Sequence, residues 1–165
     1  MDEKTHKPNT MQNRTVVERK SDRELVVTRT FDAPAHTVFE AWAKPELFRQ
    51  WWPPKSMGMP LRSCEMDVRT GGKYRLEFGH DATNTMAFFG TYIDVIAPSR
   101  LVWTNEESAD GAITTVSFEE KTGVTLLIFR ELYASKQALD DSFPGMEGGM
   151  PEQFEQLDAL LISSM

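Results

Sequence analysis

The feature that most constrains the fold is a long stretch, from about residue 60 to residue 132, in which apolar and polar residues alternate. A two-residue period is typical of strands with one buried and one exposed face. Short turn-rich links such as Thr70-Gly71-Gly72 and Lys121-Thr122-Gly123 divide the stretch. Links this short join neighbouring antiparallel strands, whereas parallel strands need a crossover of roughly a dozen residues or more. The pattern therefore predicts an antiparallel sheet and not an alternating α/β fold.

Helical patterns lie on both sides of this stretch. Leu25–Phe31 predicts a first strand, and Pro34 and Pro45 each suit the first turn of a short helix. We expect Gly145–Pro151 to be a flexible lead-in to the last helix, and ligand binding would make Gly145–Gly149 a mobile gate. That helix carries one apolar stripe: Met150, Phe154, Leu157 and Leu161. We predict an α+β fold. A curved antiparallel sheet of about six or seven strands would have the two short helices and the long C-terminal helix over its concave face.

Length and composition limit the class of protein. The 165 residues suit a disordered tail over residues 1–20 and a single domain over residues 21–165. The net charge is −7, whereas proteins that bind nucleic acids are usually positively charged. Cys64 is the only cysteine and the three histidines have no metal-ligand spacing, so we expect no metal, and no cofactor fingerprint is present. No apolar run reaches the roughly 18–20 residues of a membrane span, and we predict a cytoplasmic protein.

A cavity is expected because one long helix cannot fill the concave side of so wide a sheet. The aromatic and methionine residues are the candidates for its walls, although core packing is the alternative for each of them. Alternation alone leaves open which strand face points inward, since a one-residue shift inverts every face. We predict that a ligand contacts these residues: Trp51, Phe78, Met86, Phe88, Trp103, Phe118, Met150 and Phe154.

Catalytic candidates are few. Asp67 would be a general base if its carboxylate entered an apolar cavity, with Tyr74 or Tyr92 as a proton donor. The competing interpretation is that Asp67 pairs with Arg69 on the same strand face. The same ambiguity applies to three further residues: Glu77, Arg130 and Glu131.

Several strings share an order and spacing with a known superfamily. They are Phe31-Asp32-Ala33-Pro34, Trp51-Trp52-Pro53, the segment from Cys64 to Arg75 with its Gly71-Gly72 pair, and Glu147-Gly148-Gly149-Met150. Together they make residues 24–162 resemble the START-like (SRPBCC, helix-grip) superfamily. The branch they are most similar to is that of the activator of heat-shock-chaperone ATPase homologues. Many members carry Trp where Met150 stands, which implies a differently shaped cavity wall here.

The resemblance implies a START-like ligand-binding domain over residues 21–165, shaped as a cup closed by the C-terminal helix. Relatives bind lipids, polyketides or plant hormones, a few catalyse cyclisation or hydrolysis, and others regulate a chaperone. We favour binding of a small apolar or amphipathic ligand. A cyclase or hydrolase using the same cavity and a chaperone-regulating interaction module are the alternatives, because fold does not fix function. Ligand identity and oligomeric state are left open.

Overall fold

A computed structural model describes residues 14–163 of the chain. It confirms the predicted α+β class, with an antiparallel sheet, two short helices and a long C-terminal helix. The elements follow one another as β1 (Val16–Arg19), β2 (Glu24–Phe31), α2 (Ala35–Ala43), α3 (Pro45–Trp51), a 3-10 turn (Lys55–Met57), β3 (Leu61–Met66), β4 (Lys73–Asp81), β5 (Asn84–Ile96), β6 (Arg100–Thr104), β7 (Ile113–Lys121), β8 (Val124–Leu132) and α4 (Lys136–Ser163).

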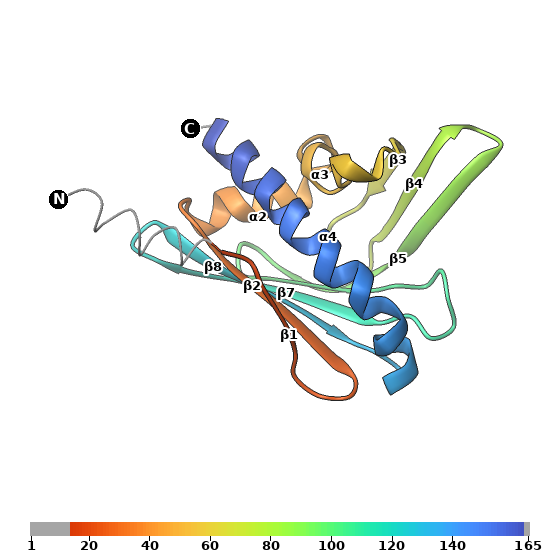
Figure 1. Cartoon of the computed structure of the whole chain (residues 1–165). Helices are drawn as coiled ribbons and strands as arrows, with labels where there is room; N and C mark the ends of the chain where they lie inside the picture. Colours follow the sequence, from red (N-terminus) through yellow and green to blue (C-terminus); the bar gives the residue numbers. More distant parts are fainter. Residues whose placement is uncertain (1–13, 164–165) are drawn as a thin grey trace.

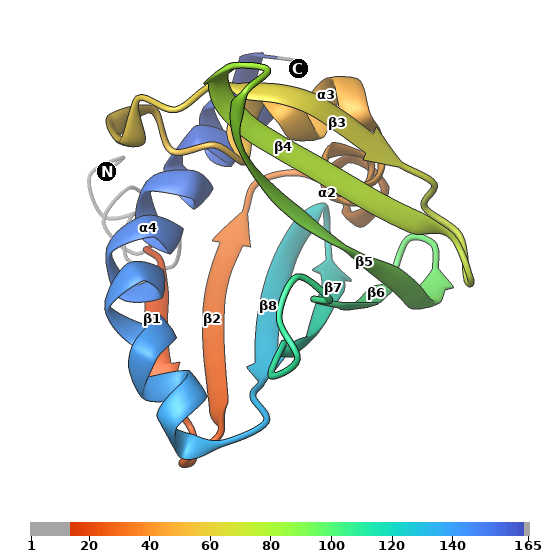
Figure 2. The ribbon, with the colours of Figure 1, turned by 90° about the vertical axis from the view of Figure 1, so that its right-hand side faces the viewer.

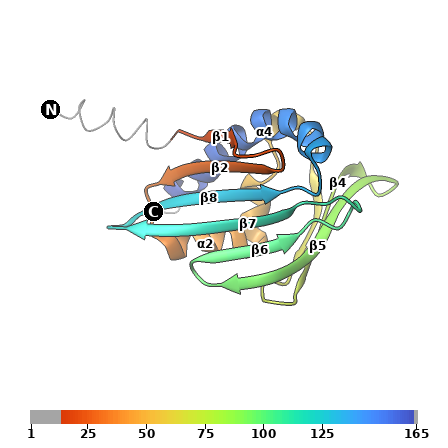
Figure 3. The same ribbon diagram turned by 90° about the horizontal axis from the view of Figure 1, so that it is seen from below.

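The strands form one curved sheet in the order β1-β2-β8-β7-β6-β5-β4-β3, and each neighbouring pair is antiparallel. In Figure 1, α4 runs obliquely over one face of this sheet. Figure 2 shows β3, β4 and β5 crossing at a steep angle to β2 and β8, and Figure 3 shows the strands from below with the helices behind them. All three helices therefore cover the concave face, as the sequence predicts.

β1 is an eighth strand that the sequence analysis did not predict, because it lies in the supposed disordered tail. Its four residues pair with β2, from Val16 opposite Thr28 to Arg19 opposite Leu25. A run of four residues is too short to display a period, and its strand form comes from pairing with the edge of the sheet. The prediction of disorder is wrong for these residues, whereas residues 1–13 of the predicted tail lie outside the described residues.

α4 is longer than predicted and begins at Lys136, so the supposed lead-in Gly145–Pro151 lies inside a helix of 28 residues. The Oγ of Ser135 accepts a hydrogen bond from the backbone N–H of Ala138 at 3.1 Å, which caps its start. Pro144 and Pro151 lie within the helix, where each removes a backbone hydrogen bond. Tertiary packing overrides this weak helix propensity, because α4 is packed against other elements at both ends.

The packed core lies where α2, α3 and the C-terminal half of α4 meet the sheet. Trp42 is at its centre and makes ring contacts with seven aromatic side chains: Phe48, Trp51, Trp52, Trp103, Phe118, Phe129 and Phe154. The indole N–H of Trp51 donates to the carbonyl oxygen of Ala41 at 2.9 Å. Between residues 14 and 163, no helix combines the length and the apolar character that crossing a bilayer would need.

Candidate ligand-binding cavity

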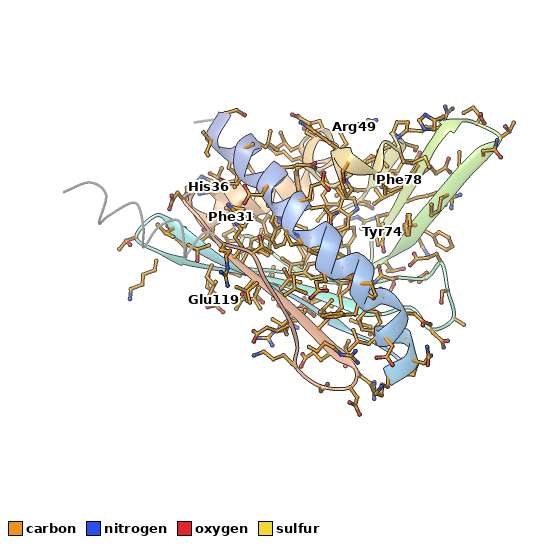
Figure 4. The ribbon with its side chains drawn as sticks, in the orientation of Figure 1. Phe31, His36, Arg49, Tyr74, Phe78 and Glu119 are labelled. Carbon is orange, nitrogen blue, oxygen red and sulfur yellow. The ribbon has the colours of Figure 1, made fainter. Side chains whose placement is uncertain are left out.

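A cavity of about 770 Å³ lies beside this core, between the N-terminal half of α4 and the concave face of the sheet. Its volume falls within the roughly 300–1,000 Å³ of small-molecule sites. The walls are mainly apolar and come from α3, from the strands β3, β4, β5, β6 and β8, from the β6–β7 connection and from α4. In Figure 4, Tyr74 and Phe78 lie between β4 and α4, where both line the cavity.

The space exists because α4 presents small side chains here. Four of its cavity-lining residues follow one another at helical spacing: Ala138, Ser142, Gly145 and Gly149. Spacings of four, three and four place them on one side of the helix. Side chains this small cannot reach the sheet, so the gap between helix and sheet stays open.

Five of the eight predicted ligand-binding residues line the cavity: Phe78, Met86, Phe88, Trp103 and Met150. Met86 and Phe88 are 52% and 36% exposed, which places them at the opening. Met150 is 1% exposed and forms part of the inner wall. That a ligand contacts these five side chains stays a prediction.

The other three lie in the packed core and do not line the cavity. Trp51 and Phe154 are both 0% exposed, and Phe118 is 4% exposed. The edge-to-face contacts of Trp42 with Trp51, Phe118 and Phe154 occupy their ring surfaces. The residue type alone does not reveal which end of the concave face an aromatic side chain occupies. These three side chains pack in the core, which was the alternative considered for each of them.

The three catalytic candidates are placed apart. Tyr74 and Tyr92 line the cavity, with ring centroids 5.7 Å apart. Asp67 does not line it, and its carboxylate accepts hydrogen bonds from the Nε of Arg69 at 2.9 and 3.0 Å. The side chains of Asp67 and Arg69 are 54% and 73% exposed. The Asp67–Arg69 pair is therefore a surface pair, and the Asp67 carboxylate is outside the space that a ligand would occupy.

A chain of hydrogen bonds crosses the polar end of the cavity. The Nδ2 group of Asn105 donates to the hydroxyl of Thr114 at 2.9 Å, and this hydroxyl donates to Oε2 of Glu131 at 2.8 Å. The hydroxyl of Tyr133 donates to Oε1 of Glu131 at 2.6 Å. Strand pairing positions the chain, since Glu131 on β8 lies directly opposite Thr114 on β7. Three residues of this chain line the cavity, Asn105, Glu131 and Tyr133, and Thr114 is fully buried behind them.

Burial controls the titration of these groups. Desolvation raises the pKa of the Glu131 carboxyl, and the hydrogen bonds from Tyr133 and Thr114 oppose this only in part. Desolvation also raises the pKa of the Tyr74, Tyr92 and Tyr133 hydroxyls. All three phenols are therefore neutral hydrogen-bonding groups near neutral pH, and Glu131 is the acidic group deepest in the cavity wall.

The polar chain was largely missed by sequence reasoning, which left Glu131 ambiguous and did not consider Asn105 or Tyr133. A signal was present. Glu131 continues the inward series Leu127, Phe129 on β8, and Asn105 follows Trp103 by two residues. A polar residue that falls on the apolar parity of a strand is a better candidate than Asp67, which falls on the polar parity.

Among residues 14–163, no three His, Cys, Asp or Glu side chains are grouped so that they could hold a metal ion.

Comparisons with known proteins agree with this architecture. The family model described as activator of Hsp90 ATPase homolog 1-like protein matches residues 32–162. A crystal structure from Rhodobacter sphaeroides has 23% identity and a TM-score of 0.83, covering 92% of this chain and 99% of the other. A Mycobacterium smegmatis protein, at 24% identity, covers 92% and 99% with a TM-score of 0.77. A Nitrosomonas europaea protein, at 20% identity, covers 88% and 98% with a TM-score of 0.77. These similarities show a shared fold. No curated protein sequence matches the chain.

Proposed function

This chain belongs to the family of activator of Hsp90 ATPase homolog 1-like proteins, and from that membership we propose that it binds a small apolar or amphipathic molecule in the cavity between α4 and the sheet. The family is built on a fold whose helix and sheet can enclose a ligand. In this chain, the fold leaves about 770 Å³ open.

The observation that carries the proposal is the division of the cavity into an apolar wall and one polar end. Aromatic rings and thioethers from several strands and from α4 line most of the space. At one end, Glu131 is held by the hydroxyls of Thr114 and Tyr133. Sites for small molecules combine a mainly apolar lining with a few placed polar groups that fix orientation. A molecule with an apolar body and one polar head group matches this arrangement.

Two neighbouring glycines of α4 supply a matched test. Gly149 lines the cavity, and a Cβ built on it meets only Oε1 of Gln153 at 3.8 Å. Gly148 does not line the cavity, and a Cβ built on it meets nothing within 4 Å. We expect Gly149→Leu to fill part of the cavity, while Gly148→Leu makes the same change in helix propensity outside it.

The experiment is an amide-resolved NMR titration with a fatty acid, a flavonoid, a polycyclic aromatic, a fatty alcohol and an alkylamine. At least one probe should give saturable shifts that cluster at Phe78, Trp103 and Met150. Gly149→Leu should weaken its binding about tenfold or more, a loss of about 1.4 kcal/mol, and Gly148→Leu should leave it unchanged. Spectra that stay flat across the whole panel would contradict the proposal.

A second candidate function, acid–base catalysis in the same cavity, is favoured by one observation. Glu131 is a desolvated carboxyl with a raised pKa, beside the Tyr133 hydroxyl at 2.6 Å. A general base poised closer to neutral pH has these properties. Glu131, and not Asp67, would then carry the proton transfer. For a turned-over ligand, Glu131→Gln should abolish turnover, and unchanged turnover would remove Glu131 as the base.

A further inference from the structure

The charges around the cavity narrow the class of ligand, an inference that rests on the proposed function. Within the described range, residues 14–163, the cavity lining contains four acidic residues, Glu107, Asp110, Glu131 and Asp141, and no Lys, Arg or His. We infer that the ligand is a cationic amphiphile, an apolar body that carries a protonated amine, and that Glu131 binds the ammonium group. Anionic amphiphiles such as fatty acids would be excluded by the same charges.

Glu131 has acceptor capacity left for such a partner. Each of its carboxylate oxygens accepts one hydrogen bond, from Tyr133 and from Thr114. A carboxylate offers about four lone-pair positions, so about two are unused and can accept N–H donors from an ammonium group. The surrounding hydroxyls fix the orientation of the carboxylate without neutralising its charge.

Among the residues that the structure describes, no side chain supplies that neutralising charge. Within residues 14–163, no ion pair of 4.0 Å or less reaches Glu131. Arg23 is engaged elsewhere, donating from Nε to the Tyr133 carbonyl oxygen at 2.8 Å, and Lys136 pairs with Asp140 at 3.0 Å. The charged group that acts on Glu131 is another carboxylate, that of Glu107. Glu131 is half-buried and partly desolvated, so its carboxylate is costly to keep without a cation, and a cationic ligand would offset that cost.

The aromatic walls suit the same head group. Trp103 and Phe129 line the cavity with ring centroids 6.5 Å apart, and Tyr74 lies 6.4 Å from Trp103. Ring faces attract ammonium groups through their quadrupole, and the attraction grows when water is excluded. Aromatic rings and a carboxylate together discriminate an amine from a neutral alcohol of the same length.

The other three acids are exposed, from the β6–β7 connection and the first turns of α4: Glu107, Asp110 and Asp141. Acids at the entrance of a cleft raise the local concentration of cations and repel anions. The entrance and the interior therefore select the same sign of charge.

The test uses three probes with one apolar body, decylamine, decan-1-ol and decanoate, below their micelle concentrations at neutral pH. In the wild-type protein, decylamine should bind at least tenfold more tightly than decan-1-ol, and decanoate should bind most weakly. Glu131→Gln should lower the affinity for decylamine to that of decan-1-ol and leave decan-1-ol unchanged. Glu119→Gln is the matched control, since it removes one carboxylate from the end of β7, well separated from Tyr74 in Figure 4. This control should keep the tenfold preference.

The outcomes separate the two proposals. If decan-1-ol binds in the cavity as tightly as decylamine, or decanoate binds most tightly, the cationic inference is overturned and ligand binding stands. If Glu131→Gln and Glu119→Gln lower decylamine affinity equally, the preference reflects net charge and the role of Glu131 is overturned. If none of the three probes nor any other member of the panel binds, the proposed function fails, and this inference with it. The wild-type comparison of the three probes needs no variant.

Discussion

The two halves of α4 differ in how they meet the rest of the molecule. Beyond Pro151, Phe154 and Leu157 are fully buried, and the Nε2 of Gln156 donates to the carbonyl oxygens of Trp51 and Pro53 at 2.7 and 2.9 Å. Before Pro151, small residues face the cavity, and the helix contains Pro144 and three glycines. We refer to these as the packed half, Pro151–Ser163, and the cavity half, Lys136–Met150.

The difference teaches how one helix can both hold a domain together and leave room for a ligand. Large apolar side chains in the packed half are buried and stabilise the fold by roughly 1.5–3 kcal/mol each. In the cavity half, Leu139 is buried and Arg19 bonds Asp140 at 2.8 Å, which attaches the helix to the sheet at its start. Between its ends the cavity half is held by the half-buried side chains of Phe143 and Met146, while its small residues face the cavity.

The largest effect should come from truncating a side chain in the packed half. Phe154→Ala removes a fully buried ring that contacts Phe31, Trp42 and Trp51, and we expect a loss of about 3–5 kcal/mol in the free energy of unfolding. Met146→Ala in the cavity half, which enlarges a space that is already open, should cost less than about 1.5 kcal/mol. Urea denaturation measures both. Equal losses would mean that the two halves support the fold equally.

An ion-pair cluster holds the packed half to β2, and removing it should have the next largest effect. The Arg29 side chain is 3% exposed and bonds Glu155 at 2.9 Å and Asp158 at 3.3 Å. Arg29→Met keeps an apolar stem but leaves Asp158 without its cation. We expect a loss of about 2 kcal/mol, below the roughly 3–5 kcal/mol of a fully buried pair, since Glu155 is 69% exposed.

The matched control is Arg69→Met, which breaks the exposed pair with Asp67. It should change the unfolding free energy by no more than about 0.5 kcal/mol. If the two arginine variants lose similar stability in urea denaturation, burial does not distinguish these pairs.

The polar end of the cavity should show an inverse dependence of stability on pH. Because the pKa of Glu131 is raised above its ordinary value of 4.5, the folded protein binds that proton more tightly than the unfolded chain. Below pH 4.5 the group is protonated in both states and has no effect. As pH rises from 4.5 through the raised pKa, the wild type should lose stability relative to Glu131→Gln, by about 1.4 kcal/mol for each pH unit that separates the folded from the unfolded pKa.

Urea denaturation of both proteins between pH 4 and pH 8 measures this difference. Glu106 supplies a control of opposite sign, since hydrogen bonds from the Thr104 and Thr91 hydroxyls lower its pKa. The pKa of Glu106 lies below its ordinary value of 4.5 in the folded protein. The wild type should therefore gain stability relative to Glu106→Gln as pH rises from this lowered pKa to about 4.5. A flat difference for Glu131 would show that its carboxyl is not desolvated in the folded state.

The comparison of the two halves also explains what sequence could predict. Alternation identified the strands from β3 to β8, and the stripe from Met150 to Leu161 identified the packed half, since large apolar residues at helical spacing have few other uses. The cavity half escaped prediction because glycine and proline argue locally against a helix, and the contacts that hold it come from β1 and the sheet. The Ser135 cap was the one local signal of its start.

The candidate site, like α4, could be predicted from the sequence only in part. Residue type selected Phe78, Met86, Phe88 and Trp103 as candidates, and the structure is what places them on the face that lines the cavity, because strand alternation alone left the inward face open. Residue type could not separate these from Phe118, because the position of a ring along the concave face depends on which strands and helices meet there. Finding Glu131 required a different argument. A charged residue at a strand position whose neighbours two residues away are apolar faces the interior, where burying a charge is costly, so it is a candidate for a functional role.

The smallest predicted effect concerns the glycines of the cavity half. Gly148 is exposed and helical, and a Cβ built on it meets nothing within 4 Å, so Gly148→Ala should stabilise the protein by about 0.5–1 kcal/mol. Gly58→Ala is the counterpart, since Gly58 has the same open surroundings but a φ of +66°. There alanine should destabilise by about 1 kcal/mol.

Native-state hydrogen exchange then shows which part of α4 the Gly148→Ala substitution stabilises. Backbone amides between Pro144 and Pro151 should exchange faster than those of Phe154 and Leu157, because local opening is easiest where few apolar contacts oppose it. Gly148→Ala should slow exchange in the cavity half alone. Uniform exchange along α4 would show that its two halves open together, and the mobile gate predicted at Gly145–Gly149 would have to be abandoned.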